Sequence, residues 1–69
     1  MLISDLPPCP FTFTRLAECA ERELNMRRHV YPNRIMTSRM SRETANAELD
    51  MMRHIAEIMR ALARTERML

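Results

Sequence analysis

The chain has no glycine, no lysine and no tryptophan among its 69 residues, and it has only one tyrosine and two phenylalanines. Without glycine there is no glycine-rich loop to hold a phosphate. Two cysteines, Cys9 and Cys19, are too few for a disulfide-rich secreted scaffold, so we expect reduced thiols. No uncharged run reaches the length of a membrane span, and no leader that would direct export opens the sequence. These absences favour a small protein that acts inside the cell.

Catalytic and metal-binding patterns are also missing. Cys9, Cys19, His29 and His54 do not have the spacing of a zinc site. Asp50 and His54 are one helical turn apart, a spacing more typical of a surface ion pair than of an acid–base dyad. We therefore expect no enzymatic activity, no metal and no cofactor, and we look for a binding function instead.

The pattern of apolar residues predicts an all-α fold, because no segment alternates as a strand would. Residues 1–11 contain three prolines and are expected to form an extended arm. A first helix is predicted over about 12–31, with Thr12 as its N-cap. Pro32 disfavours the helical conformation at Tyr31, so we expect the first helix to end there.

The remaining residues predict a connection over 32–40 and a second helix over about 42–67, capped by Ser41. The whole chain, 1–69, is thus expected to be a single small domain, an antiparallel two-helix hairpin. At 1.5 Å per residue, the second helix would be about two turns longer than the first.

The second helix has two apolar stripes, whereas packing against one neighbour needs only one. The first stripe is Ala45, Leu49, Met52, Ala56, Met59 and Ala63. The second stripe, which we expect to be a dimer interface, contains Met51, Ile55, Ile58 and Leu62. Small domains are often stabilised by association. A homodimer of hairpins in a four-helix arrangement is therefore predicted.

Positive charge gathers around the expected turn. From Arg22 to Arg42 there are six arginines and one acid, Glu23. Arginine and tyrosine often anchor protein interfaces, while arginines with a stacking ring also suit nucleic acid. The modest net charge of +2 leans toward a protein partner and leaves nucleic acid as the alternative. The predicted partner-binding residues are Arg27, Arg28, Tyr31, Arg34, Arg39, Arg42 and Glu43. A core position under the connection is the alternative for Tyr31.

Residues 21–32, ERELNMRRHVYP, and the later RMS at 39–41 resemble a family of short helical proteins encoded by temperate phages. This family includes the anti-quorum-sensing protein of Pseudomonas phages. It commonly has an aromatic residue two positions after the proline, where this chain has Arg34. It often has glycine before R-M, where this chain has Ser38.

The resemblance implies a dimeric inhibitor that works by stoichiometric binding in the host cell cytoplasm. It implies as partners the DNA-binding domain of a quorum-sensing transcription activator and the type IV pilus assembly ATPase. Binding to the ATPase would block piliation and exclude superinfecting phages. The alternative function is a small nucleic-acid-binding phage regulator.

Overall fold

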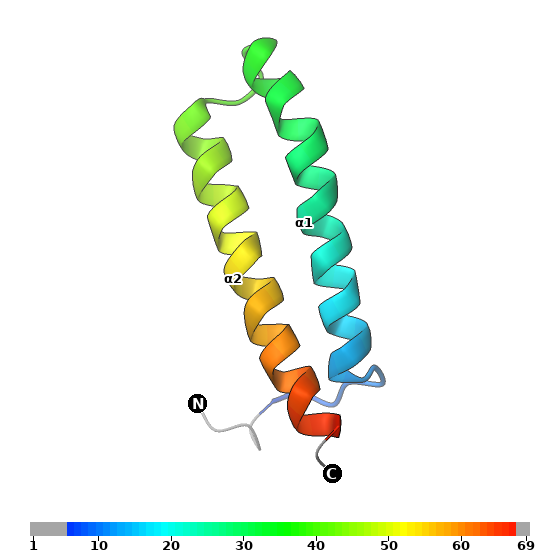
Figure 1. Ribbon diagram of the computed structural model, residues 1–69. Helices are drawn as coiled ribbons and strands as arrows, with labels where there is room; N and C mark the ends of the chain where they lie inside the picture. The colour runs from blue at the N-terminus through cyan, green and yellow to red at the C-terminus, as the bar shows by residue number, and fades with distance from the viewer. Residues whose placement is uncertain (1–5, 68–69) are drawn as a thin grey trace.

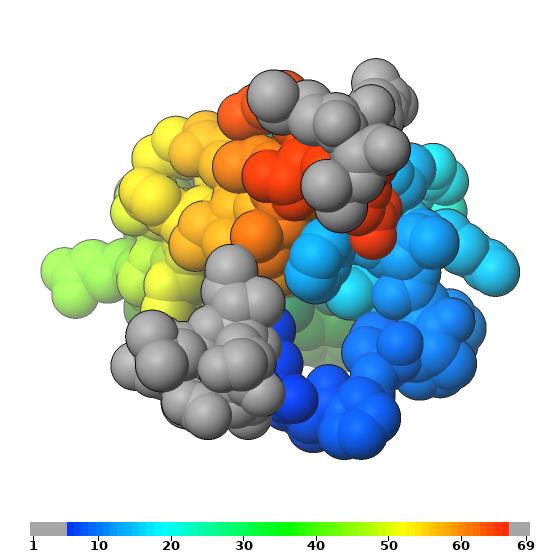
Figure 2. Space-filling view, turned by 90° about the horizontal axis from the view of Figure 1, so that it is seen from below, coloured from blue at the N-terminus to red at the C-terminus, as the bar shows by residue number. Residues whose placement is uncertain are grey.

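The computed structural model describes residues 6–67 and contains two helices, α1 (Phe13–Met36) and α2 (Arg42–Arg67), packed side by side as an antiparallel hairpin (Figure 1). No strand occurs in this part of the chain, which confirms the all-α prediction. Residues 6–11 run without helix across the end of the hairpin, from α2 to the start of α1 (Figures 1 and 2). Residues 1–5 of the expected arm lie outside the described residues.

Both helices begin at the residues that the sequence indicates. The Thr12 hydroxyl accepts a hydrogen bond of 3.1 Å from the amide of Arg15, which caps α1. The Ser41 hydroxyl accepts one of 3.1 Å from the amide of Thr44, which caps α2. In each case a hydroxyl satisfies a backbone donor that the first turn leaves without a partner.

The expected end of α1 at Tyr31 is wrong, because the helix continues through Pro32 to Met36. Proline inside a helix costs about 3 kcal/mol, since it removes a backbone hydrogen bond and crowds the preceding turn. Tyr31 is buried and Ile35 is half-buried, so apolar contacts on both sides of the proline favour continuing the helix. The two helices, of 24 and 26 residues, are therefore nearly equal in length, and the expected two-turn overhang is absent.

The seam between the helices is built mainly from alanine. Ala17 and Ala45 are 0% exposed and Ala63 is 1% exposed, whereas no large side chain in the described residues is completely buried. Leu24 and Met52 add bulk near the centre, beside Ala20 and Ala56. The first predicted stripe of α2 therefore does face α1, at a close approach that small side chains allow.

The turn at the end of α1 requires a left-handed residue, and Ser38 supplies it with φ of 59°. The amide of Arg39 donates to the carbonyl of Arg34 (2.9 Å), and that of Ser38 donates to the carbonyl of Ile35 (3.1 Å). These two bonds form a Schellman motif, in which glycine is the usual left-handed residue. Ser38 therefore occupies its backbone conformation at an energetic cost.

Replacing Ser38 with glycine is expected to stabilise the hairpin by about 1 kcal/mol, because glycine has no Cβ to clash in the left-handed region. Thermal unfolding followed by circular dichroism should show Tm rising by about 4–8 °C. Ser38→Ala is the control, since alanine keeps the Cβ and should leave Tm nearly unchanged. An equal rise in both variants would contradict the explanation.

The open end of the hairpin is closed by Glu66, near the end of α2. Its carboxylate accepts hydrogen bonds from the amides of Phe13 (2.6 Å) and Thr14 (3.1 Å), and from the Thr14 hydroxyl (3.2 Å). The amide of Phe13 is the main cause that holds the pKa of Glu66 below its ordinary value of 4.5. A negative charge at the N-terminus of α1 also complements the helix dipole.

Glu66→Gln is therefore expected to lower Tm by several degrees at pH 7. The stabilisation by ionised Glu66 is complete above pH 4.5 and is lost as pH falls through the lowered pKa of the folded state. The difference in Tm between variant and unmodified protein should consequently narrow in acid. Glu57→Gln, which removes a carboxylate bound only to Arg53, is the control with a smaller expected effect. A Tm difference that is constant from pH 3 to pH 7 would contradict the prediction.

Candidate functional site

The hairpin tip, residues 33–43, carries exposed arginines around an exposed methionine. Met36 is 82% exposed, the highest value among the large apolar side chains of the described residues. Arg34, Arg39 and Arg42 are also exposed, and none of them forms an ion pair with a described residue. Glu43 is the one acid of the tip. The tip is therefore a cationic surface with an apolar, flexible side chain at its end.

Tyr31 lies beneath this surface and is not part of it. Its side chain is only 8% exposed, and the guanidinium of Arg34 lies over the ring at 5.9 Å from the centroid. A guanidinium over an aromatic ring is attracted to the face of the ring, so Tyr31 helps to hold the Arg34 side chain in place. Tyr31 therefore has the buried position under the connection that the sequence left as the alternative, and its contact with a partner stays a prediction.

Arg27 is committed to contacts within the hairpin. Its Nε donates to Oε1 of Glu23 at 2.9 Å, and its Nη1 lies 3.4 Å from Oε2 of Glu48 on α2. The bond with Glu23 is the main cause that raises the pKa of Arg27, and only 25% of its side chain is exposed. Arg27 thus links α1 to α2 within the hairpin, and its partner-binding role stays a prediction. Arg28, the next residue, is exposed and lies over a groove between the helices.

The second stripe of α2 is exposed, as the sequence predicts for a face that α1 cannot cover. Met51, Ile55 and Ile58 are 52%, 48% and 56% exposed, and Leu62 is half-buried. We call these four residues the apolar face. These apolar side chains gather on one side of the helix and are in contact with water, which is unfavourable. Such an exposed apolar patch is typical of a contact surface.

Two residues of α1 also expose large apolar side chains and are not among the predicted interface residues. Met26 is 54% exposed and Val30 is 36% exposed. Val30 follows Arg27 by three residues, and Met51 follows Glu48 by three, so both lie on the side that the Arg27–Glu48 ion pair marks. The i,i+3 spacing is visible in the sequence. It indicates that Val30 and Met51 lie on the same side of the hairpin only when the pairing of Arg27 with Glu48 is known.

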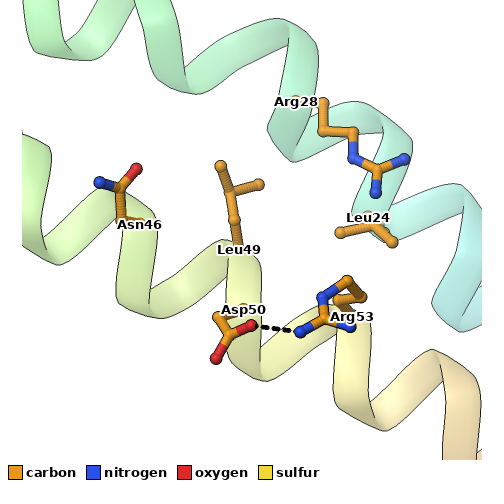
Figure 3. A pocket seen from close by; sticks show the side chains of 6 residues that line it. All are labelled: Leu24, Arg28, Asn46, Leu49, Asp50 and Arg53. Carbon is orange, nitrogen blue, oxygen red and sulfur yellow. Dashed lines mark hydrogen bonds and ion pairs between the residues drawn. The ribbon is translucent and has the colours of Figure 1, made fainter.

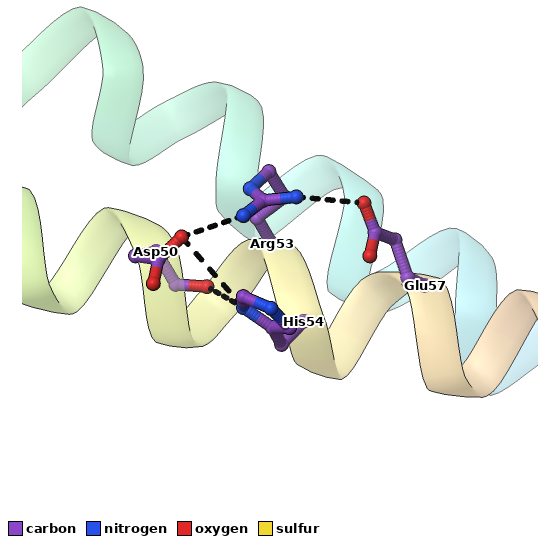
Figure 4. Close-up of polar contacts among 4 residues, drawn as sticks. All are labelled: Asp50, Arg53, His54 and Glu57. Carbon is purple, nitrogen blue, oxygen red and sulfur yellow. Dashed lines mark hydrogen bonds and ion pairs between the residues drawn. The ribbon is translucent and has the colours of Figure 1, made fainter.

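A polar network covers another side of α2 (Figure 4). Arg53 donates to Asp50 at 2.7 Å and to Glu57 at 3.0 Å, and Nδ1 of His54 lies 3.7 Å from Oδ1 of Asp50. The bond from Arg53 is the main cause that lowers the pKa of Asp50. The side chains of Asp50 and His54 are more than half exposed, so water screens the contact between them.

Residues 6–67 contain neither a metal-binding cluster nor a helix that could span a membrane. Within that range, no group of three histidine, cysteine or acidic residues lies close enough to hold a metal ion. Cys9 and Cys19 are free and exposed. Neither described helix has the length and apolar character needed to cross a membrane.

No protein-family model matches the chain, and neither a curated protein nor a solved structure is similar to it. The candidate sites therefore rest on their own geometry. Of the predicted partner-binding residues, Arg34, Arg39, Arg42 and Glu43 come together at the tip. Arg27 and Arg28 lie further down α1, on different sides of the hairpin.

Proposed function

We propose that the chain is a phage-encoded inhibitor that binds a host regulatory protein stoichiometrically through the hairpin tip. The observation that carries the proposal is the exposed Met36 beside three arginines that have no acidic partner among the described residues. An exposed apolar side chain surrounded by arginine is typical of a protein interface, where both contribute to affinity. Bare phosphates would use the arginines but not the thioether.

A homodimer is part of this proposal. The apolar face of α2, extended by Met26 and Val30, would be covered by the same face of a second hairpin, giving a four-helix arrangement. Each dimer would then present two tips. The tip residues lie outside the apolar face, so dimerisation and partner binding do not compete for the same side chains.

The resemblance to the phage family supplies the partners to test. These are the DNA-binding domain of a quorum-sensing activator and the type IV pilus assembly ATPase. An activator domain that binds DNA is itself basic, so arginines of the tip must meet local acids or carbonyls there. For that domain Glu43, at the start of α2, is the tip residue with complementary charge.

The deciding experiment measures binding of each purified partner by calorimetry. Arg39→Ala/Arg42→Ala should weaken binding of at least one partner by roughly tenfold or more, corresponding to about 1.4 kcal/mol. Arg22→Ala/Arg64→Ala is the matched control, because it removes two exposed arginines away from the tip and should change affinity little. Equal loss in both double variants would contradict a specific role for the tip.

Nucleic acid is the second candidate, favoured by the same unpaired arginines. Duplex DNA binding would weaken steeply with salt, in proportion to the phosphates contacted. Nanomolar duplex binding with such a slope, together with no binding of either protein, would replace the inhibitor proposal.

A further inference from the structure

A groove runs along the seam between α1 and α2, apart from both the tip and the apolar face. Its first hollow is a shallow, open depression of about 220 Å³ lined by Leu24, Arg28, Asn46, Leu49, Asp50 and Arg53 (Figure 3). A second hollow of about 300 Å³ shares Leu24, Arg28 and Arg53 with the first and continues along the seam to Arg60. We call the two together the seam groove.

The floor of the seam groove is apolar. Leu24 and Ala56 are buried at 8% and 5% exposure, and Leu49 is half-buried beside them. A volume of about 220 Å³ offers room for one large apolar side chain. Such a side chain would cover the leucines and remove apolar surface from water, which favours binding.

The rim is charged, and its charges are nearly all paired. Arg60 holds Glu21 through two hydrogen bonds, and Arg53 holds Asp50 and Glu57. Of the three arginines that line the groove, Arg28 alone forms no ion pair with a described residue. Figure 3 shows Arg28 and Leu24 projecting from α1, opposite the residues of α2. An incoming carboxylate thus finds one available guanidinium above an apolar floor.

We propose that the seam groove binds an acidic amphipathic helix of a partner protein. An apolar side chain of that helix would lie over Leu24 and Leu49, while a glutamate or aspartate one turn away would pair with Arg28. The three arginines and three acids that line the groove balance in charge, and Arg28 is the member left to pair with a carboxylate of the helix. The apolar floor selects a peptide over a free phosphate or a nucleic acid backbone. This surface goes beyond the proposed function, because it lies apart from the tip.

The test uses the full chain labelled with ¹⁵N and a 14-residue probe peptide that has leucines on one helical face and glutamates beside them. Titration followed by NMR should shift the amides of Leu24, Arg28 and Asn46 first. Arg28→Ala should weaken binding roughly tenfold, as loss of a charge-assisted hydrogen bond implies. Arg28→Lys should restore part of the affinity, because it restores the charge without the planar fork.

Two controls make the assignment specific. Arg22→Ala removes an exposed arginine on another side of α1 and should leave the affinity for the peptide unchanged. Arg39→Ala/Arg42→Ala should also bind the peptide normally, which separates this site from the tip. Arg28 is exposed and unpaired, so its variants should keep the dispersed spectrum of the folded hairpin.

Three outcomes would overturn the proposal. The first is equal affinity of the unmodified protein and Arg28→Ala. The second is equal binding of a peptide in which lysine replaces every glutamate. The third is a set of shifts centred on Met51, Ile55 and Ile58, which would assign the peptide to the apolar face.

Discussion

Replacing Ile58 with aspartate is expected to dissociate the proposed dimer into monomers. Ile58 is 56% exposed in the hairpin, so the substitution leaves the seam between α1 and α2 intact, but in a dimer the new carboxylate would be buried without a partner. We expect the dissociation constant to rise at least 100-fold, which corresponds to about 3 kcal/mol. Sedimentation equilibrium measures the change directly.

The matched control for this variant is Asn46→Asp. Asn46 is exposed on the same helix and lines the seam groove, apart from the apolar face. Both substitutions place the same side chain in α2, so a difference between their dissociation constants reports the loss of the interface. A stable monomer of the unmodified protein at millimolar concentration would refute the dimer.

Ala17→Leu is expected to have the largest effect on the hairpin itself. Ala17 is 0% exposed at the seam, where a leucine would force α1 and α2 apart or adopt a strained rotamer. The expected loss is about 2–3 kcal/mol, and Tm should fall by about 10–20 °C. Thermal and urea unfolding of the same samples provide the measurement.

Ala47→Leu is the control for helix propensity and added apolar volume. Ala47 is exposed on α2, so a leucine there meets no neighbouring helix in the hairpin and should change Tm little. Similar behaviour of the two variants would mean that the seam tolerates larger residues, contrary to the close packing of its alanines.

Local sequence signals predicted the elements well where one residue controls the structure. Thr12 and Ser41 start the helices because their hydroxyls cap the first turns, and this chemistry depends only on nearby residues. The end of α1 was predicted wrongly for the opposite reason. The local penalty of Pro32 is outweighed by burial of Tyr31 and Ile35, and that burial depends on where α2 lies.

The same distinction applies to the candidate site. The cluster of arginines is visible in the sequence. The sequence does not show which of these arginines form ion pairs within the hairpin and which do not. Arg27 forms an ion pair with Glu48, which is 21 residues away in the sequence. Only the register of the two helices brings these two side chains together. The exposed stripe of α2 was predictable from the spacing of its apolar residues. That spacing shows two apolar sides on the helix, and a single neighbouring helix can cover only one of them.

The alanine-rich seam also has a consequence for the lifetime of the protein in the cell. A hairpin that completely buries no large side chain among its described residues gains little apolar burial of its own, so association should supply much of its folding free energy. Tm should then rise with protein concentration, and dilution should make the chain sensitive to proteases. The protein would persist while it is abundant and would be degraded as its synthesis ends.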